Sequence, residues 1–359
     1  MIIKRLWLTD FRNHAATDVE LNDKVTLVIG LNGHGKTNLI EGLHLLSGAR
    51  SFRGAKVDAL VASGRPSAYL RAEVEHEGRT SLVEVELATQ GRSKAQVNKQ
   101  KIKRFRDLGD AVRVVVFSPD DLNIIKGPPS IRRSLLDETI AVGSAEFRAV
   151  RTDFDQILRQ RNNLLKQARG RDSDDLKANL HVWDEQLIDA AKVVGQHRSD
   201  FVASIEPVVS DFYQRVAGLN TSVSLQLDTD WKEGLAAVLS RVRDDEIRRG
   251  MTLVGPHRDD LTILLGSLHS RFHASQGEQR SLALALRLAT YVFVEEATGD
   301  QSVVLLDDVF SELDETRARR LVECLPDSQI ILTSATGTVP DGIDPVQTLE
   351  IVEGQIHGN

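Results

Sequence analysis

The sequence has almost no cysteine, because Cys324 is the only one in 359 residues. This excludes a disulfide within the chain and a zinc cluster built from cysteines. The sequence also lacks any apolar run close to the ~20 residues that a membrane-spanning helix needs. Residues 1–14 contain no apolar block followed by a small-residue cleavage site, so they do not resemble a signal peptide. These absences predict a cytoplasmic protein with no membrane partner.

An excess of positive charge is missing too. The formal net charge is −7, and 27% of the residues are charged. This balance excludes a surface coated in positive charge, so binding to nucleic acid must come from a local basic patch. Hydrophobic residues make up 41% of the chain, which is enough for a sizeable core. At ~150 residues per domain, the length predicts two or three domains.

Both ends of the chain show α/β patterns around a helical middle. Residues 118–130 contain three prolines and are predicted to form a loop at a domain boundary. Residues 130–217 have helical spacing with a polar break at 168–175, which indicates two antiparallel helices. With ~20 residues each, these helices form a short arm that reaches ~30 Å. The predicted strands are 2–8, 24–30, 69–78, 79–91, 94–102, 112–117, 221–230, 302–308, 329–334 and a hairpin at 349–356; further helices are predicted at 38–48 and 231–249 and from Gln276 and Asp314.

Residues 30–37 read Gly-Leu-Asn-Gly-His-Gly-Lys-Thr and match the phosphate-binding P-loop pattern. Its glycines let backbone N–H groups turn toward a phosphate, Lys36 neutralises the β and γ oxygens, and the Thr37 hydroxyl ligates Mg²⁺. The alternative is a glycine turn with a chance lysine, and the second half of the site described next argues against it. The predicted nucleotide-binding residues here are Gly30, Asn32, Gly33, His34, Gly35, Lys36, Thr37 and Asn38.

That second half is the apolar strand 302–306, which ends in Asp307 and Asp308 and has the Walker B pattern. Asp307 is predicted to hold Mg²⁺, and Asp308 is predicted to orient or deprotonate the attacking water. Lys36, Asp307 and Asp308 are therefore the predicted catalytic residues, and Thr37 and Asp307 the predicted metal ligands. The alternative is a buried strand with an exposed acidic end.

A third motif, Ser275-Gln-Gly277-Glu278, opens a predicted helix. A serine and a glycine at a helix N-terminus can bind an anion, although an ordinary helix cap is the alternative. The order of P-loop, Ser-x-Gly-Glu, Walker B and a Ser-Glu-Leu-Asp segment ending at Asp314 resembles the ABC ATPases. This resemblance implies that Ser275, Gly277 and Glu278 of one subunit cap ATP held by the P-loop of another, with Asp314 at the dimer seam.

Ser275 follows Lys36 by 239 positions (275 − 36), and this long insert is similar to the heads of the SMC and Rad50 group. The segments 119–137, 255–261, 275–283 and 8–13 narrow the resemblance to the RecF family of bacterial recombination mediators. The resemblance implies a protein that binds ATP, Mg²⁺ and DNA and forms an ATP-dependent homodimer. It also implies RecR and RecO as partners in directing RecA onto gapped DNA, a link to the SOS response, and a position near the nucleotide for Arg12 and Asn13.

Three departures from the wider superfamily predict slow hydrolysis. Asp308 stands where a longer glutamate is usual, and Thr333 and Ser334 stand where a switch histidine is often found. Residues 112–122 contain no glutamine that could contact Mg²⁺. We therefore expect a weak, DNA-linked ATPase that acts as a switch rather than as a motor.

Residues 91–106 contain seven lysines and arginines and no acidic residue. This segment is the predicted DNA-contacting stretch, and the alternative is a solvated hairpin that happens to be basic. For Arg132 and Arg133 three roles are open: DNA contact, helix capping or pairing with acids. His257, which precedes Arg258, has either a structural or a nucleotide-linked role. The predicted DNA contacts are Arg50, Arg53, Lys94, Lys99, Lys101, Lys103 and Arg104.

Together these patterns predict an α/β protein with an ABC ATPase head, whose mixed sheets surround the P-loop, and an inserted, mainly helical second domain. Residues 1–118 and 270–359 are assigned to the ATPase domain and 119–269 to the helical arm. The predicted function is an ATP-dependent DNA clamp of recombinational repair and replication, located in the cytoplasm with the nucleoid. The alternatives are a chromosome-structural head of the SMC or Rad50 type and a transporter energy subunit. The missing long coiled coil argues against the first, and the long insert argues against the second.

Overall fold

The computed structural model describes residues 1–168 and 173–357. The chain divides into two compact units. Unit 1 comprises residues 1–122, 212–219 and 280–359, and unit 2 comprises residues 123–211 and 220–279. The predicted division is 1–118 with 270–359 against 119–269; the two units differ from it in that residues 119–122 and 212–219 belong to unit 1 and residues 270–279 to unit 2. The division falls inside helices α6 (Asp174–Ala217) and α9 (Gln276–Thr298).

Unit 1 contains an antiparallel sheet of six strands in the order β2-β1-β4-β5-β6-β7. Alternation of apolar and polar residues directs one side of each strand into the core, and Ile3, Leu6 and Leu8 of the first strand are fully buried. The sequence pattern missed strand β2, whose alternation is weak. The strands are β1 (Ile2–Phe11), β2 (His14–Glu20), β4 (Ser67–His76), β5 (Arg79–Ala88), β6 (Lys94–Val97) and β7 (Gln100–Lys101).

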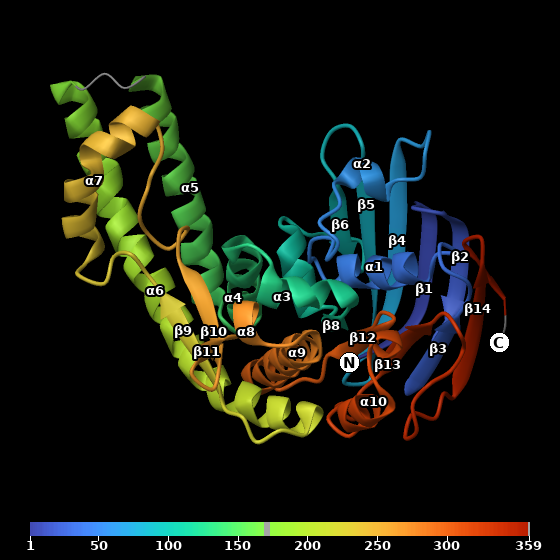
Figure 1. Cartoon of the computed structure of the whole chain (residues 1–359). Coiled ribbons are helices and arrows are strands. Elements are labelled where there is room, and N and C mark those ends of the chain that lie inside the picture. Colours follow the sequence, from blue (N-terminus) through green and yellow to red (C-terminus); the bar gives the residue numbers. More distant parts are fainter. Residues whose placement is uncertain (169–172, 358–359) are drawn as a thin grey trace. The chain divides into compact units, whose positions relative to one another are not determined.

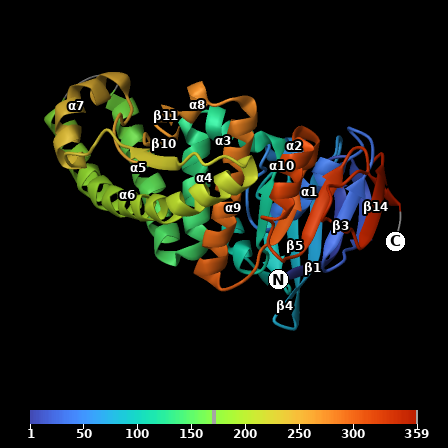
Figure 2. The same ribbon diagram turned by 60° about the horizontal axis from the view of Figure 1, so that its bottom comes forward.

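The second sheet of unit 1 has the order β15-β14-β3-β13-β12-β8 and is parallel except for β15. Strand β14 lies beside β3 in both views of the molecule (Figures 1 and 2). The loops that follow β3, β12 and β13 meet at one edge, because the carboxyl ends of parallel strands lie together. The strands are β3 (Val25–Ile29), β8 (Val114–Phe117), β12 (Val303–Leu306), β13 (Ile330–Ser334), β14 (Gln347–Val352) and β15 (Gln355–His357).

Helix α1 (Lys36–Leu46) packs against strands of both sheets and joins them into one hydrophobic core. The predicted apolar face of this helix is confirmed, since Leu39, Leu43 and Leu46 are fully buried. Unit 1 also contains the short helices α2 (Val57–Leu60) and α10 (Glu315–Val322) and the 3-10 turns η1 (Phe105–Asp110), η2 (Pro119–Asp121) and η3 (Val309–Glu312).

Unit 2 is mainly helical and carries a small antiparallel sheet in the order β11-β10-β9. The arm helix α6 spans 44 residues with Pro207 inside it, so it is about twice as long as the sequence pattern predicted. Positions 169–172 of the predicted polar break lie outside the described residues. The elements are α3 (Leu122–Lys126), α4 (Pro129–Gly143), α5 (Ala145–Ala168), α7 (Leu235–Arg249), α8 (Ser270–His273), β9 (Val223–Asp228), β10 (Asp260–Leu265) and β11 (Leu268–His269).

The prediction of a loop over 118–130 is wrong, because most of this segment is helical. Ser118 and Asp121 form a capping box, in which each side chain bonds the backbone of the other, and Pro119 occupies the first turn. A second helix starts at Pro129, another first-turn proline. Prolines here begin helices rather than interrupt them.

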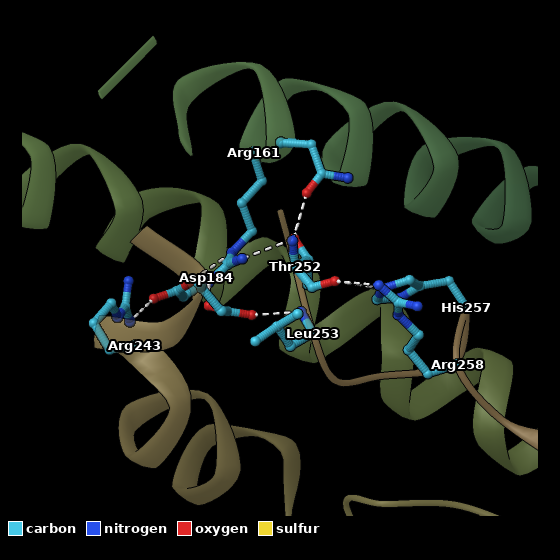
Figure 3. Close-up of polar contacts among 9 residues, drawn as sticks. Arg161, Asp184, Arg243, Thr252, Leu253, His257 and Arg258 are labelled. Carbon is cyan, nitrogen blue, oxygen red and sulfur yellow. Dashed lines mark hydrogen bonds and ion pairs between the residues drawn. The ribbon is translucent and has the colours of Figure 1, made fainter. Parts of the chain in front are cut away.

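A buried arginine joins three elements of unit 2 (Figure 3). Arg161 of α5 is fully buried and donates to Asp184 Oδ1 at 2.8 Å, Glu246 Oε2 at 2.6 Å and Thr252 Oγ1 at 2.8 Å. Glu246 in turn accepts from the backbone N–H of Leu253 at 2.9 Å. The network satisfies charges that burial would otherwise penalise, and it connects α5, α6 and α7 to the segment that follows α7.

Other conspicuous charges of unit 2 also have structural partners. Arg132 pairs with both carboxylate oxygens of Asp260, at 2.7 and 2.9 Å, and Arg133 donates to the Asp259 carbonyl at 2.6 Å. His257 contacts the Thr252 carbonyl at 3.2 Å, and burial lowers its pKa to about 4. Among the three roles considered for Arg132, pairing with an acid is the one with a partner in place.

Among residues 1–168 and 173–357, none of the helices combines the length and the apolar character needed to span a bilayer.

Candidate nucleotide-binding site

The loop between β3 and α1 has the backbone that the P-loop pattern requires. Gly33 and Gly35 have φ angles of 84° and 118°, in the region where a side chain is strained. At Gly30 the limit is space, because a Cβ atom would lie 2.4 Å from the carbonyl oxygen of Ile351 in β14. Glycine at these positions lets the chain turn tightly at the end of β3, as in loops that surround phosphates.

Lys36, the first residue of α1, is buried within this loop and is 6% exposed. Its Nζ donates to the carbonyls of Gly30 at 2.6 Å and Leu31 at 3.1 Å. Burial lowers the pKa of Lys36, and the carboxylates of Asp308 and Asp307 partly oppose this change. The ammonium group is therefore held by the loop carbonyls, close enough to the two Walker B acids for their charges to act on it.

The hydroxyls of Thr37 and Thr333 both donate to Asp307 Oδ1, each at 3.0 Å. Thr37 comes from the start of α1, Asp307 follows β12, and Thr333 lies on β13, so the parallel sheet brings them together. Burial raises the pKa of Asp307 above its usual value, while the bonds from Thr333 and Thr37 act in the opposite direction. A carboxylate and a hydroxyl at the end of a P-loop are hard oxygen donors that fit Mg²⁺ with bound phosphate.

Asp308 has a left-handed backbone with φ 50°. Aspartate adopts this region more readily than most residues, because its short side chain can bond locally. Its N–H donates to Thr333 Oγ1 at 2.9 Å, and its carbonyl accepts from Ser311 Oγ at 2.8 Å. The threonine at the position expected for a switch histidine therefore holds the side chain of Asp307 and the backbone of Asp308.

Asn13, Asn38 and Arg53 form a polar chain beside the loop. Asn13 Nδ2 donates to the His34 carbonyl at 3.0 Å, and its Oδ1 accepts from Asn38 Nδ2 at 2.8 Å. Arg53 Nη1 lies 3.4 Å from Asn38 Oδ1, and its charge acts to lower the pKa of Asp307. Arg53 was assigned to DNA by its nearness in sequence to other basic residues, whereas the fold brings it to the P-loop helix.

The side chain of Arg12 pairs with helix α1 rather than with the P-loop. Its guanidinium makes a bidentate pair with the buried Glu41 of α1, at 2.9 and 3.0 Å, and Ser51 Oγ also donates to Glu41 at 2.5 Å. The predicted place of Arg12 near the nucleotide is thus a place beside the helix that follows the P-loop. Neither Glu41 nor His14, which lies under the loop, was singled out from the sequence, although His14 directly follows the Arg12-Asn13 pair.

Ser275 caps helix α9 in a reciprocal capping box. The Ser275 N–H donates to Glu278 Oε2 at 2.7 Å, and the Glu278 N–H donates to Ser275 Oγ at 3.3 Å. Ser275 is exposed and Gly277 is partly exposed, while the side chain of nearby Phe272 is 73% exposed. The start of α9 therefore presents an accessible helix N-terminus with an apolar neighbour.

Asp314 is the N-cap of α10, and its Oδ1 accepts from the Arg317 N–H at 2.9 Å. It is exposed, and so is the Ser311-Glu312 pair before it. Its Oδ1 makes the bond of an ordinary helix cap, and its Oδ2 lies 3.3 Å from Nη1 of Arg317, while the Asp314 side chain as a whole is 55% exposed.

The basic segment 91–106 forms the β6–β7 hairpin and the start of η1. Asn98 and Lys99 make its turn with φ angles of 50° and 65°. Lys94 pairs with Glu86 of β5 at 3.0 Å, so part of its charge is compensated. The loop with Arg50 packs on this segment, since a Cβ atom at Gly48 would lie 2.0 Å from the Phe105 carbonyl. The exposed basic residues on this surface are Arg50, Arg92, Lys94, Lys99, Lys101, Lys103 and Arg104.

This combination of fold and site defines an ABC-type ATPase head. The family model described as "RecF/RecN/SMC N terminal domain" matches residues 2–356. The SMC head domain of Pyrococcus furiosus, solved with an extended coiled coil and bound to the C-terminal domain of ScpA, shares the fold with a TM-score of 0.54 at 17% identity, over 99% of this chain and 95% of the other.

Within this class the chain belongs to the RecF family. It is 38% identical to the DNA replication and repair protein RecF of Streptomyces avermitilis and 37% identical to that of Acidothermus cellulolyticus, with 99% of each chain covered in both cases. A solved structure of the recombination mediator RecF-ATP in the RecFOR pathway superposes with a TM-score of 0.91 at 30% identity, over 100% of this chain and 97% of the other. The predicted family and fold class are confirmed, and the similarity to SMC heads is one of fold.

Proposed function

We propose that this chain is an ATP-dependent DNA-binding protein of recombinational gap repair and replication. ATP and Mg²⁺ close two copies into a homodimer that holds DNA, and slow hydrolysis reopens it. One observation carries the proposal: Thr37, Asp307 and Thr333 meet within 3.0 Å contacts at the edge of the parallel sheet where Lys36 and the P-loop lie. The solved RecF-ATP structure, 30% identical to this chain, supports ATP as the nucleotide.

In this proposal residues 1–118 with 270–359 form the ATPase domain, and residues 119–269 form the mainly helical arm. The N–H groups of the glycine loop and the start of α1 bind the β-phosphate, and Lys36 neutralises the β and γ oxygens. Thr37 and Asp307 hold Mg²⁺, which supplies charge neutralisation for the phosphates. Asn32 in the loop and Asn38 in α1 also take part in nucleotide binding. Asn13 orients Asn38 through the 2.8 Å hydrogen bond between their side chains.

Hydrolysis is slow because the side chain after Asp307 is short. Asp308 orients or deprotonates the attacking water, but its carboxylate extends one methylene less than a glutamate would. Its left-handed backbone is held by Thr333 and Ser311, so the main chain cannot shift easily to compensate. Nucleotide turnover then acts as a timer for the DNA-bound state.

The dimer uses Ser275, Gly277 and Glu278 of one copy against the nucleotide on the other. The accessible N-terminus of α9 supports this role, because it offers N–H groups and a hydroxyl to an anion. Asp314 takes part in the seam, where its exposed carboxylate oxygen faces the second copy. The partners that follow from family membership are RecR and RecO, through which RecA is directed to gapped DNA in the nucleoid of the cytoplasm.

The test is sedimentation of the protein with Mg²⁺-ATP, with Mg²⁺-ADP and without nucleotide, each with and without a gapped duplex at modest salt. We expect a monomer that dimerises only with ATP and then retains DNA. A monomer under every condition, or DNA binding that ignores ATP, contradicts the proposal. Hydrolysis measured in parallel, with and without DNA, reports the weak DNA-linked activity.

Ser275→Arg is expected to block the ATP-dependent dimer while the monomer still binds ATP. The arginine adds bulk and charge at the start of α9, where the second copy has to approach. Sedimentation measures the dimer, and a fluorescent ATP analogue measures monomer binding. Ser173→Arg is the matched control, since Ser173 is also an exposed serine whose Oγ accepts a helix N–H, that of Leu176 at 3.2 Å. If the Ser275→Arg monomer loses ATP binding to the same extent as it loses dimerisation, the idea of a site shared between two copies is contradicted.

Replacing Lys99, Lys101 and Lys103 by alanine is expected to weaken DNA binding and flatten its salt dependence. Each phosphate contact contributes ~0.9 to the slope of log K against log salt, so the slope should fall by roughly two to three. The control replaces the exposed Lys24, Lys192 and Lys232, which changes the net charge equally. An unchanged slope in the first variant, or an equal change in the control, would remove the β6–β7 hairpin from the DNA interface.

A further inference from the structure

Two short segments from opposite ends of the sequence meet beneath the P-loop. One contains Asn13 and His14, at the turn between β1 and β2, and the other is the turn Glu353-Gly354 between β14 and β15. The His34 carbonyl accepts two hydrogen bonds there, from Asn13 Nδ2 at 3.0 Å and from the Gly354 N–H at 2.8 Å. Two bonds to a single P-loop carbonyl, from segments more than three hundred positions apart (354 − 13 = 341), indicate a built support rather than an incidental contact.

The next carbonyl is held in the same way. Gly35 O accepts from His14 Nε2 at 3.1 Å and from the helical N–H of Leu39 at 2.9 Å. A carbonyl can only accept, so Nε2 carries the ring proton. Burial lowers the pKa of His14, although its bonds to the Gly35 and Gly354 backbone oppose this change. The fully buried ring therefore stays neutral near pH 7 in the donor form that the loop needs.

Rigid peptide planes carry this support to the phosphate side. In a trans peptide the C=O and the following N–H point in opposite directions, and the chain has no cis peptide among the described residues. Holding the His34 carbonyl therefore aims the Gly35 N–H, and holding the Gly35 carbonyl aims the Lys36 N–H. These are N–H groups with which a P-loop surrounds a phosphate.

The two segments touch each other as well as the loop. A Cβ atom at Gly354 would lie 2.0 Å from the carbonyl oxygen of Asn13, so the C-terminal turn approaches backbone against backbone. The Thr17 hydroxyl lies between them, 2.9 Å from His14 Nδ1 and 3.4 Å from the Gly354 carbonyl. A Cβ atom at Gly35 would in turn lie 2.9 Å from the Asn13 amide. The P-loop, the β1–β2 turn and the β14–β15 turn are therefore closely packed against one another.

We propose that the β14–β15 turn and His14 set the geometry of the P-loop, so that Gly354 and His14 are positioning residues for nucleotide phosphates. This inference rests on the proposed nucleotide site and extends it to the C-terminal hairpin, which carries no recognisable nucleotide motif. Neither residue touches the phosphate; each acts through the carbonyl that it holds.

The chain offers a matched pair of variants for the test. Glu353-Gly354 and Glu77-Gly78 are both hairpin turns with two positive φ angles, 50° and 78° in the first and 49° and 71° in the second. Gly78 joins β4 to β5, and a Cβ atom there would meet no atom within 4 Å. Gly354→Ala and Gly78→Ala therefore impose the same backbone strain, and only the first displaces the P-loop support.

Gly354→Ala is expected to weaken binding of mant-ATP to the monomer at least tenfold, and Gly78→Ala less than twofold. Amide hydrogen exchange of residues 33–37, measured without nucleotide, should rise in the first variant alone. Equal effects of the two alanines on affinity and exchange would overturn the proposal. Hydrogen exchange is measured without nucleotide, and affinity is measured on the monomer. Both results are therefore independent of whether ATP drives dimerisation.

A second pair covers the case in which Gly354→Ala does not fold. His14→Leu removes the donor to Gly35 at similar volume, whereas His14→Gln keeps an N–H donor on a side chain of comparable reach. We expect faster exchange and weaker mant-ATP binding in the leucine variant and partial recovery of both in the glutamine variant. If the leucine variant retains wild-type exchange and affinity, His14 does not position the loop.

Discussion

Lys36→Met is expected to weaken ATP binding a hundredfold or more and to abolish the ATP-dependent dimer. Lys36 is buried, and its Nζ lies 2.6 Å from the Gly30 carbonyl. The ammonium group is therefore inside the loop that is proposed to bind the phosphates. Removing one partner of a buried charge pair costs about 3 kcal/mol, which corresponds to roughly a hundredfold in affinity. Methionine keeps the length of the side chain and removes the charge, so the loss reports electrostatics rather than packing.

Stability of the variant separates this explanation from misfolding. Because burial lowers the pKa of Lys36, the folded chain disfavours the charged form, and a neutral side chain should leave the melting temperature unchanged or raise it. Lys24→Met is the control, since the exposed Lys24 immediately precedes β3, at the end of that strand opposite the P-loop. A Lys36→Met dimer that still forms with ATP would contradict the role of the P-loop as the switch.

Arg161→Ala is expected to destabilise unit 2 by about 3–5 kcal/mol, because it leaves the buried Glu246 without its cation and leaves Asp184 paired with Arg243 alone. The side chain of Glu246 is fully buried and that of Asp184 is 7% exposed, and both lose a bond from Arg161 (Figure 3). Denaturation followed by tryptophan fluorescence measures the change. In a Trp7→Phe background the remaining tryptophans, Trp183 and Trp231, both lie in unit 2 and report its unfolding.

Arg159→Ala is the matched control, because Arg159 lies on the same helix and is exposed. Its effect should stay within ~0.5 kcal/mol, as for most surface substitutions. The double variant Arg161→Met with Glu246→Gln should recover part of the loss, since it removes a buried charge together with its partner. If Arg161→Ala and Arg159→Ala destabilise unit 2 equally, the buried network contributes nothing specific to this unit.

The chemistry-bearing motifs could be predicted because each depends on consecutive residues. Gly33 and Gly35 allow the positive φ angles that the loop needs, and Lys36 and Thr37 follow at the start of α1. The strand ending in Asp307 was predicted for the same local reason, as an apolar run followed by acids. The family and the fold class followed from the order of such motifs along the chain, and the comparisons confirm both.

Sequence patterns were less informative where the same residues fit two structures or where contacts form only after the chain folds back. The segment 118–130 was predicted as a loop from its prolines, but a capping box between Ser118 and Asp121 starts a helix there. The contact of Arg53 with Asn38 beside the P-loop helix could not be predicted from its neighbours in sequence, and its assignment to DNA stays a prediction. Spacing predicts which face of an element is buried, but it carries no information on which distant side chains that face meets.

The sequence alone therefore predicted a phosphate-binding glycine loop in an ABC-type head, because backbone freedom and ligand chemistry are properties of neighbouring residues. Only the tertiary structure decided what surrounds that loop. Thr333 beside Asp307, Glu41 behind Arg12, and Gly354 under His34 are contacts between parts of the chain that the sheets bring together. Such contacts depend on strand order and register, which no local pattern encodes, and they hold the loop in the shape on which its chemistry depends.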